Sequence, residues 1–395
     1  MKILMAHNFY KSTAPSGEDI VFQNEFKLLQ NNGIDVITYT KHNDDIQKLS
    51  IYSKLKLPTK CIWSIETYRE IKKLIRREKP DIVHFHNIWY LISPSAYYAC
   101  KDYGVVPIVQ ALHNFRIFCA NGLLLRNNNV CEECLNKVPW KAIFYGCYNN
   151  SHFYSIPIAL TEWVHQIIGT WKNTVNSYIA LTNFSKNKFI QAGISQDKIY
   201  IKPNFLPNPP EPDYSNNDYA IFIGRLSKEK GIEILIEAFK KLPKFLKLFI
   251  IGDGPLRTKI EDLLKSEKIY NINLIGSLNH SQCIQFLKKS SCLILPSICF
   301  ETFSMVICEA FACGKPVIAS NIGAMAELVE NGKTGLLFEP KNPEELAMKV
   351  KWMIENKDAC VEMGKNARKV FEEKYTEEKN INMLLDIYRN NLKKQ

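Results

Sequence analysis

Residues 291–320 read SCLILPSICFETFSMVICEAFACGKPVIAS. The short apolar runs at the two ends, SCLILPS and KPVIAS, are typical of buried strands, and TFSMVICEAFA between them has the length of a helix. Strand, helix and strand in this order indicate a parallel sheet covered by helices. Two acids, Glu301 and Glu309, interrupt this otherwise apolar and small-residue segment. Because acids are rarely buried without a partner, we expect both to serve a ligand.

The same alternation of strand-like and helix-length segments extends through most of the chain. The apolar runs of the first half are KILMAHNF, IDVITYT, DIVHFHN, PIVQALHN and SYIALTN. A stretch rich in proline, asparagine and acids follows at residues 202–218, and then the pattern restarts with YAIFIGR, LKLFIIGDG and INLIGSL. This repeated order favours two doubly wound α/β domains over one.

We therefore predict an α/β protein with two Rossmann-like domains. The first spans residues 1–203 and contains a cysteine-bearing insertion at about 115–150, where no period is visible. A linker at 204–218 leads to the second domain at 219–375. A C-terminal helix at 376–395 could cross back to the first domain.

Composition narrows the classes of function. Apolar residues make up 46% and charged residues 23%, which excludes a disordered chain. The net charge of +11 indicates an anionic partner, which could be nucleic acid, a phosphorylated metabolite or an acidic membrane surface. No apolar run is long enough to span a membrane and no signal peptide is evident, so we expect a cytoplasmic protein. The basic segment at 68–79 is either a solvated helix face or a contact with anionic lipid head groups, which would make the protein peripheral on the inner face of the membrane.

The two acids lie where a parallel sheet binds its ligands, beyond the carboxyl ends of the strands. Glu301 directly follows the strand SCLILPS. If the helix begins near Thr302, Glu309 lies about two turns further along it. The helix N-terminus between the two acids suits a phosphate, because its N–H groups are unpaired and carry partial positive charge. The pair could thus bind hydroxyls on either side of a diphosphate, as in a nucleotide sugar; the alternative is one exposed and one structural acid.

A second stretch, IFIGRLSKEKGIEILIEAF at 221–239, supplies the matching cations. Arg225 follows Gly224 at the end of a strand, and Lys230 lies in the loop that opens the next helix. An arginine fork and a lysine point charge can neutralise both phosphates of a diphosphate. The alternative is a basic loop without a ligand.

Together, GRLSKEKG and PSICFETFSMVICEAFACGKPVIAS resemble the retaining glycosyltransferases of family 4. The resemblance continues in HNFYKSTAPSGED, PDIVHFHN, VQALHNF and GDGP, so it covers nearly the whole chain. It implies the GT-B architecture, in which two Rossmann-like domains face each other. It also implies transfer of a sugar from a nucleotide diphosphate to an acceptor hydroxyl with retention of configuration, in bacterial cell-surface polysaccharide or glycolipid synthesis.

The resemblance assigns roles to the residues of the second domain. It implies that Glu301 holds hydroxyls of the donor sugar and contributes to catalysis. It implies that Glu309 binds the ribose, and that Arg225 and Lys230 clamp the diphosphate.

The start of the segment after Glu301 completes this donor site by resemblance. Backbone amides at Phe303 and Ser304, beside Thr302, are expected to contact the diphosphate. The family usually has glycine where this chain has Ser304, which puts the phosphate contact at that position in question.

Two residues of the first domain complete the expected site. Gly17 in PSGED resembles a glycine of a loop that approaches the diphosphate, although Ser16 replaces the first of the two glycines that the family often has. His113 in ALHNF resembles a catalytic histidine that faces the reacting side of the donor sugar. A lone histidine is otherwise more often structural.

No pair of aspartates in D-x-D spacing stands at a strand end, so we predict catalysis without a metal cofactor. Arg225, Lys230 and the helix terminus would stabilise the charge of the leaving group. The resemblance implies front-face transfer, in which the departing phosphate accepts the proton of the acceptor and Glu301 is no covalent nucleophile.

Four cysteines in the insertion form a separate candidate site. Cys131 and Cys134 have the spacing of a zinc knuckle, and Cys119 and Cys147 could supply the other two ligands. The alternatives are thiols without a metal or a redox-sensitive pair.

The expected partners are a UDP- or GDP-sugar as donor and a saccharide or lipid-linked saccharide as acceptor. A nucleotide-sugar epimerase on the same architecture is a second interpretation. A non-catalytic basic nucleic-acid-binding protein is a third, disfavoured because the basic residues are not interleaved with aromatic stacking residues.

Overall fold

The computed structural model describes residues 1–12, 16–48, 50, 52, 56–102, 106–215 and 219–393. Residues 13–15, before Gly17, the last three residues of the predicted linker and the last two of the predicted C-terminal helix lie outside this description. The chain divides into two compact units. The first consists of Met1–Leu124, Glu132–Asn204 and Asn380–Gln395, and the second of Leu125–Cys131 and Phe205–Lys379.

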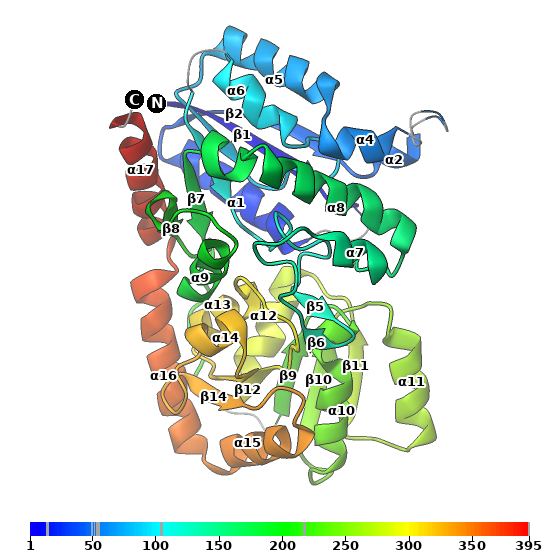
Figure 1. Cartoon of the computed structure of the whole chain (residues 1–395). Helices are drawn as coiled ribbons and strands as arrows, with labels where there is room; N and C mark the ends of the chain where they lie inside the picture. The colour runs from blue at the N-terminus through cyan, green and yellow to red at the C-terminus, as the bar shows by residue number, and fades with distance from the viewer. Residues whose placement is uncertain are drawn as a thin grey trace. The chain divides into compact units, whose positions relative to one another are not determined.

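A six-stranded parallel sheet forms the centre of the first unit (Figure 1). Its strands are, in spatial order, β2 (Asp35–His42), β1 (Lys2–Phe9), β3 (Ile82–Phe85), β4 (Ile108–Ala111), β7 (Ser177–Ala180) and β8 (Ile199–Ile201). The inner strands β3, β4 and β7 are buried along their whole length, which explains their near-continuous apolar sequences.

Helices cover this sheet. They are α1 (Gly17–Asn31), α2 (Asp45–Lys48), α4 (Leu57–Ile62), α5 (Ile65–Glu78), α6 (Ser95–Lys101), α7 (Trp140–Phe144), α8 (His152–Ile167) and α9 (Asn183–Gln191), with short turns at Thr170–Thr174 and Gln196–Lys198. The first of them begins with a capping box, in which the Ser16 hydroxyl accepts the Asp19 N–H and the Asp19 carboxylate accepts the Ser16 N–H.

The second unit repeats this plan with its own parallel sheet. Its strands are, in spatial order, β11 (Ile272–Gly276), β10 (Lys247–Ile251), β9 (Tyr219–Ile223), β12 (Cys292–Leu295), β13 (Val317–Ser320) and β14 (Gly335–Phe338). Its helices are α10 (Ile232–Lys240), α11 (Arg257–Ser266), α12 (His280–Lys289), α13 (Met305–Ala312), α14 (Gly323–Leu328), α15 (Pro343–Glu355) and α16 (Lys357–Lys374), with a short turn at Lys228–Lys230. The predicted class, two Rossmann-like α/β domains, is confirmed.

In both sheets the strand that comes first along the chain lies inside the sheet, and the direction of winding reverses beside it. The reversal falls between β1 and β3 in the first unit and between β9 and β12 in the second. Open parallel sheets bind ligands at this reversal, where the loops after the two strands diverge. The loops that follow β9 and β12 carry the residues expected to bind the donor.

The insertion predicted at about 115–150 contains little regular structure. It forms a two-stranded antiparallel ribbon, β5 (Leu125–Arg126) and β6 (Asn129–Val130), followed by α7. The ribbon belongs to the second unit, where the Lys341 ammonium donates to the Asn129 amide oxygen over 2.5 Å. The short outer strands β8 and β14 were not predicted, because three or four residues carry too little periodicity to stand out.

The C-terminal helix α17 (Glu377–Lys393) belongs to the first unit from Asn380 onward. Its side chains make buried hydrogen bonds there: the Asn380 amide donates to the Pro203 carbonyl over 2.7 Å, and the Ser177 hydroxyl donates to the Asn391 amide oxygen over 2.8 Å. These contacts make the end of the chain part of the first core.

Candidate active site

Lys230 and Glu301 form an ion pair at the sheet reversal of the second unit. The Lys230 ammonium donates to Glu301 Oε1 over 2.8 Å, and the Ser297 hydroxyl donates to the same oxygen over 2.7 Å. The side chains are 31% and 14% exposed. Burial acts to lower the pKa of Lys230, but the attraction of Glu301 outweighs it and the pKa is raised. The lysine is therefore a fixed cation at neutral pH.

Glycine makes this pairing sterically feasible. Gly231 has a φ of +69°, and a Cβ at that position would lie 1.8 Å from the Pro296 carbonyl oxygen. The two loops are also joined by a backbone hydrogen bond of 2.9 Å from the Ile298 N–H to the Glu229 carbonyl. Only glycine allows an approach this close, so the sequence KEKG sets the position of Lys230 against the loop after β12.

Arg225 lies on the exposed surface directly after β9. Its loop is held by the turn after β10: the Leu226 N–H donates to the Asp253 carbonyl over 2.9 Å. A Cβ on Gly252 would lie 1.9 Å from the Gly224 carbonyl oxygen. The segment GDGP is thus a tight turn that supports the loop of Arg225.

The helix after Glu301 begins at Met305, not near Thr302 as predicted, with Ser304 as its N-cap. The Ser304 side chain makes no capping hydrogen bond. Thr302 and Ser304 are buried and Phe303 is partly exposed. The predicted start is too early, because Thr302 lies in a bend and Ser304 has extended backbone dihedrals, φ −125° and ψ 109°. The helical N–H groups therefore belong to Ser304 and the residues after it.

Glu309 has a partner that the sequence analysis missed. His280 Nε2 lies 3.2 Å from Glu309 Oε1. This hydrogen bond raises the pKa of His280, against the lowering effect of partial burial. The Glu309 side chain is 13% exposed and that of His280 62%. His280 is the first residue of α12, which is separated from α13 in the sequence by β12, and no spacing relates it to Glu309.

The residues expected from the first unit lie near its own sheet reversal. Gly17 is exposed as the first residue of α1, and a Cβ there would meet nothing within 4 Å. His113 follows β4, and its Nε2 lies 3.0 Å from His86 Nδ1 with the rings stacked. Burial, with smaller effects of the charges on His7 and Lys202, lowers the pKa of His113 to about 3. Its imidazole is therefore neutral.

A second histidine pair lies beside it. The Asn87 N–H donates to His7 Nδ1 over 3.3 Å, so the proton of His7 is on Nε2, which donates to Asp19 Oδ1 over 2.8 Å. Burial lowers the pKa of His7 despite this acid. The Asp19 carboxylate also caps α1, so His7 orients the start of that helix, next to Gly17.

The four insertion cysteines are each half-buried. Cys131 ends the segment assigned to the second unit, and the other three belong to the first. Within the described part of the chain, one group of three metal-ligand side chains converges, and it consists of Glu25, His84 and His86. The cysteines do not form such a group, and the zinc site among them stays a prediction.

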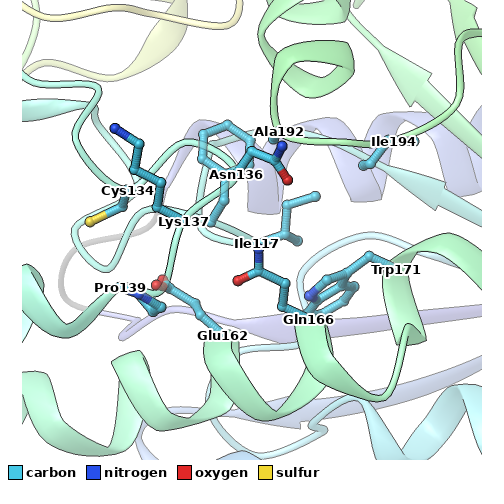
Figure 2. Close-up of a pocket in the computed structure, with 11 residues that line it drawn as sticks. Ile117, Cys134, Asn136, Lys137, Pro139, Glu162, Gln166, Trp171, Ala192 and Ile194 are labelled. Atoms are coloured by element: carbon cyan, nitrogen blue, oxygen red, sulfur yellow. The ribbon is translucent and has the colours of Figure 1, made fainter.

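A small cavity of about 20 Å³ lies elsewhere in the first unit (Figure 2). It is lined by Ile117, Phe118, Cys134, Asn136, Lys137, Pro139, Glu162, Gln166, Trp171, Ala192 and Ile194. Neither Glu162 oxygen has a hydrogen-bond partner, and burial raises the pKa of this carboxyl. The cavity has room for about one water molecule, far less than a nucleotide sugar needs. It is therefore no donor site.

The two units match two protein domain families. Residues 19–207 match the description "Glycosyltransferase Family 4" and residues 209–370 match "Glycosyl transferases group 1". Among the described residues, no helix combines the length and the apolar character that crossing a membrane requires.

Several known proteins are similar over most of the chain. An uncharacterized glycosyltransferase, MJ1178 of Methanocaldococcus jannaschii, is 27% identical over 392 residues, 98% of either chain. Sulfoquinovosyl transferase SQD2 of Arabidopsis thaliana is 30% identical over 367 residues, 89% of this chain and 66% of its own. The crystal structure of Anabaena Alr3699/HepE in complex with UDP superposes with a TM-score of 0.67 at 18% identity, covering 98% of this chain and 99% of that one. That likeness establishes the shared GT-B fold.

Proposed function

Because this chain is a glycosyltransferase with a family 4 domain followed by a group 1 domain, we propose that it moves a sugar from a nucleotide-diphosphate sugar to an acceptor hydroxyl with retention of configuration. The observation that carries the proposal is the Lys230–Glu301 pair at the sheet reversal, beside the start of α13. A cation, an acid and helical N–H groups converge there, as a sugar diphosphate requires. The comparisons give no support to the epimerase or nucleic-acid alternatives.

The donor would bind with its diphosphate between Arg225, Lys230 and the amides that begin α13. Glu301 would accept hydrogen bonds from sugar hydroxyls through the oxygen that Lys230 and Ser297 leave available. Glu309 would accept those of the ribose. Similarity to a protein crystallised with UDP supports a uridine nucleotide as the first donor to try.

In the proposed reaction the bond between the anomeric carbon and the diphosphate oxygen breaks, and the acceptor oxygen attacks the same face. The acceptor proton passes to the departing phosphate. Lys230 and Arg225 stabilise the negative charge that develops there. Glu301 already accepts two hydrogen bonds, which suits orientation of the sugar and not covalent attack. No metal ion contacts the diphosphate in this scheme.

We extend the proposal to the acceptor and the location. A saccharide or a lipid-linked saccharide would be the acceptor, and the first unit would touch an anionic membrane surface. Helix α5 supports this because its apolar side is buried at Ile71 and Ile75. Its basic residues Arg69, Lys73, Arg76 and Arg77 are exposed. A set of exposed apolar side chains adds to it: Val138, Trp140, Phe144, Tyr145, Phe153, Tyr154, Ile156, Trp163, Ile167 and Ile168.

The donor is identified by thermal-shift measurements with UDP, GDP, ADP and CMP sugars, since a ligand that binds the folded state raises the melting temperature. One class should raise it at millimolar concentration. Product analysis by NMR, with and without an acceptor, then separates transfer with retention from epimerisation. Binding of none of these donors would contradict the proposal.

The variant Lys230→Ala tests whether Lys230 binds the diphosphate of the donor. The variant loses a charged hydrogen bond to phosphate, so donor affinity should fall about 10- to 100-fold, as a loss of about 1.5–3 kcal/mol predicts. The matched control is Lys228→Ala, an exposed lysine of the same turn, which should bind donor as the wild type does. If both variants lost donor affinity equally, the loss would come from the lower net positive charge and not from a contact of Lys230.

A further inference from the structure

Three buried side chains of the first unit direct a nitrogen or an oxygen toward one point. They are Glu25 of α1, His84 of β3, and His86, the first residue after β3. Their exposed fractions are 1%, 0% and 2%. Their ligand atoms all lie within 4.8 Å of one another. His84 and His86 share a face of the sheet because strand side chains alternate with a period of two.

The two histidines are incompletely satisfied. His84 Nε2 and His86 Nε2 are both buried and neither has a hydrogen-bond partner. The nearest carboxylate oxygen to His86 Nε2 is Glu25 Oε2 at 3.7 Å, beyond hydrogen-bond distance. A buried polar atom without a partner costs free energy, so two nitrogens aimed at one carboxylate indicate a ligand between them.

The opposite nitrogen of each ring is held in place. His84 Nδ1 lies 2.8 Å from the Tyr388 hydroxyl, and His86 Nδ1 lies 3.0 Å from His113 Nε2. Metal-binding histidines use their second nitrogen in this way, because the outer hydrogen bond fixes the ring and leaves the inner lone pair for the ion.

We propose that this cluster binds a divalent first-row transition ion, Zn²⁺ by preference, through His84 Nε2, His86 Nε2 and Glu25. Two imidazoles and one carboxylate form a donor set suited to Zn²⁺. Tetrahedral Zn²⁺ places its ligand atoms about 3.3 Å apart at bond lengths of about 2.0–2.2 Å, so the three side chains need only small inward movements. The site is distinct from the four cysteines and from the donor residues of the second unit.

Lys202 would compete with the ion for the Glu25 carboxylate. Its ammonium lies 3.3 Å from Glu25 Oε1 and donates to the Asn380 amide oxygen over 3.1 Å. Binding of the ion requires this ammonium to give up Glu25 while it keeps Asn380. The competing occupant of the same space is a water molecule, which the experiment must separate from the ion.

The ion would act on His113 through His86. A neutral imidazole that binds metal through Nε2 carries its proton on Nδ1. His86 Nδ1–H then donates to His113 Nε2, and His113 keeps its own proton on Nδ1. His86 would thus be a positioning residue for His113; this consequence rests on the proposed function, whereas the metal site does not.

The first experiment uses the full chain, both as wild type and with Cys131 and Cys134 replaced by serine. Each protein is stripped with a chelator and titrated with Co²⁺ as a spectroscopic substitute for Zn²⁺. Cobalt on thiolates gives an intense sulfur-to-metal charge-transfer band, and cobalt on histidine and carboxylate does not. We expect one equivalent bound without that band when Cys131 and Cys134 are both replaced by serine. Anomalous diffraction from wild-type crystals soaked in Zn²⁺ should place the ion between His84 and Glu25.

Four variants test the ligands and the competitor. Glu25→Gln or His84→Gln should weaken Zn²⁺ binding by at least about 100-fold, and Tyr388→Phe by about 10- to 100-fold. Lys202→Met should instead tighten it about 10-fold or more, because the competing cation is gone. His42→Gln, on strand β2 and outside the cluster, is the control and should bind as the wild type does.

Three results would overturn the proposal: cobalt bound only with the thiolate band, binding unchanged in both Glu25→Gln and His84→Gln, or a water molecule without anomalous signal at the site in zinc-soaked crystals. The cobalt spectrum and the anomalous map use the wild-type ligands, so a variant that fails to fold leaves the test intact. Loss of donor binding in the second unit would bear on the proposed function and not on this site.

Discussion

The hydrogen bond between His280 and Glu309 predicts that donor affinity depends on pH. Protonated His280 engages the carboxylate that we expect to bind ribose, so it competes with the donor. The raised pKa of His280 means that the pair stabilises the fold fully below the ordinary histidine pKa of about 6.5 and loses this effect as the pH rises through the higher folded value. Donor affinity should therefore increase about 2- to 5-fold between pH of about 6 and about 8, the range for an exposed ion pair.

His280→Gln checks this prediction by calorimetric titration with the donor at several pH values. The amide cannot take up a proton, so the variant should show the high-pH affinity throughout. A pH dependence that survives in His280→Gln would assign the titration to another group.

The residues proposed for the donor site stand out in the sequence because they lie within short motifs that follow apolar strands. A recognisable apolar run precedes Arg225, Lys230 and Glu301, and Glu309 lies in the next helix. The structure pairs Lys230 with Glu301, a contact that was not predicted. Their individual roles in binding remain predictions. His280 gave no such signal, since its pairing depends on the fold of two distant helices.

The cluster of Glu25, His84 and His86 was not predicted from the sequence, for a related reason. His84 and His86 stand in a strand at a spacing of two, and that spacing was the one available sign that both point to the same face. Glu25 reads as a solvated helix position and Lys202 as the start of a linker. Long-range convergence of single polar residues has no local period, so the sequence could not predict it.

At the scale of elements, the contact between two loops depends on one glycine. Gly231→Ala would force a positive φ on alanine, at about 1–2 kcal/mol, and would push Cβ into the Pro296 carbonyl, at about 1–3 kcal/mol. We expect the free energy of unfolding to fall by roughly 3 kcal/mol and donor binding to be lost, as measured by urea denaturation and titration.

Gly332→Ala is the matched control. Gly332 has a φ of +79°, but a Cβ there meets nothing within 4 Å. It should lose only about 1–2 kcal/mol, with donor binding intact. Equal losses in the two variants would mean that the loop contact contributes nothing. The strand–loop–helix order could be read from the sequence, but the start of α13 at Met305 could not, because Thr302 and the actual N-cap Ser304 are both residue types that favour an N-cap.

At the scale of the whole molecule, the net charge of +11 and the exposed apolar residues of the first unit lead to a prediction about membranes. Phe153→Ser should weaken binding to anionic phospholipid vesicles about 10-fold, because burial of an aromatic side chain in the interface contributes about 1.5–3 kcal/mol. Vesicle co-sedimentation measures the effect. Phe245→Ser is the control, since Phe245 is 69% exposed against 71% for Phe153 but lies in the second unit.

The strands of both sheets, except the short outer strands β8 and β14, could be predicted, because buried parallel strands have near-continuous apolar sequences that helices separate. The contacts of α17 with the first unit involve side chains such as Tyr388 and Asn391, whose partners lie hundreds of residues earlier in the chain.

Two results would contradict the membrane prediction. The protein could bind neutral vesicles as well as anionic ones, or the Phe153→Ser and Phe245→Ser variants could bind anionic vesicles equally well.

The ion pair of Lys230 and Glu301 has a consequence for selectivity in a cell full of inorganic anions. The two charges offset each other, so the proposed donor site would attract free phosphate or sulfate only weakly before a donor binds. An inorganic anion could pair with the Lys230 ammonium in place of Glu301. It has no hydroxyl group to donate a hydrogen bond to the Glu301 carboxylate. A sugar diphosphate would offer a phosphate to Lys230 and hydroxyls to Glu301 together. At the proposed site, the ion pair would therefore favour the donor over small anions present in excess.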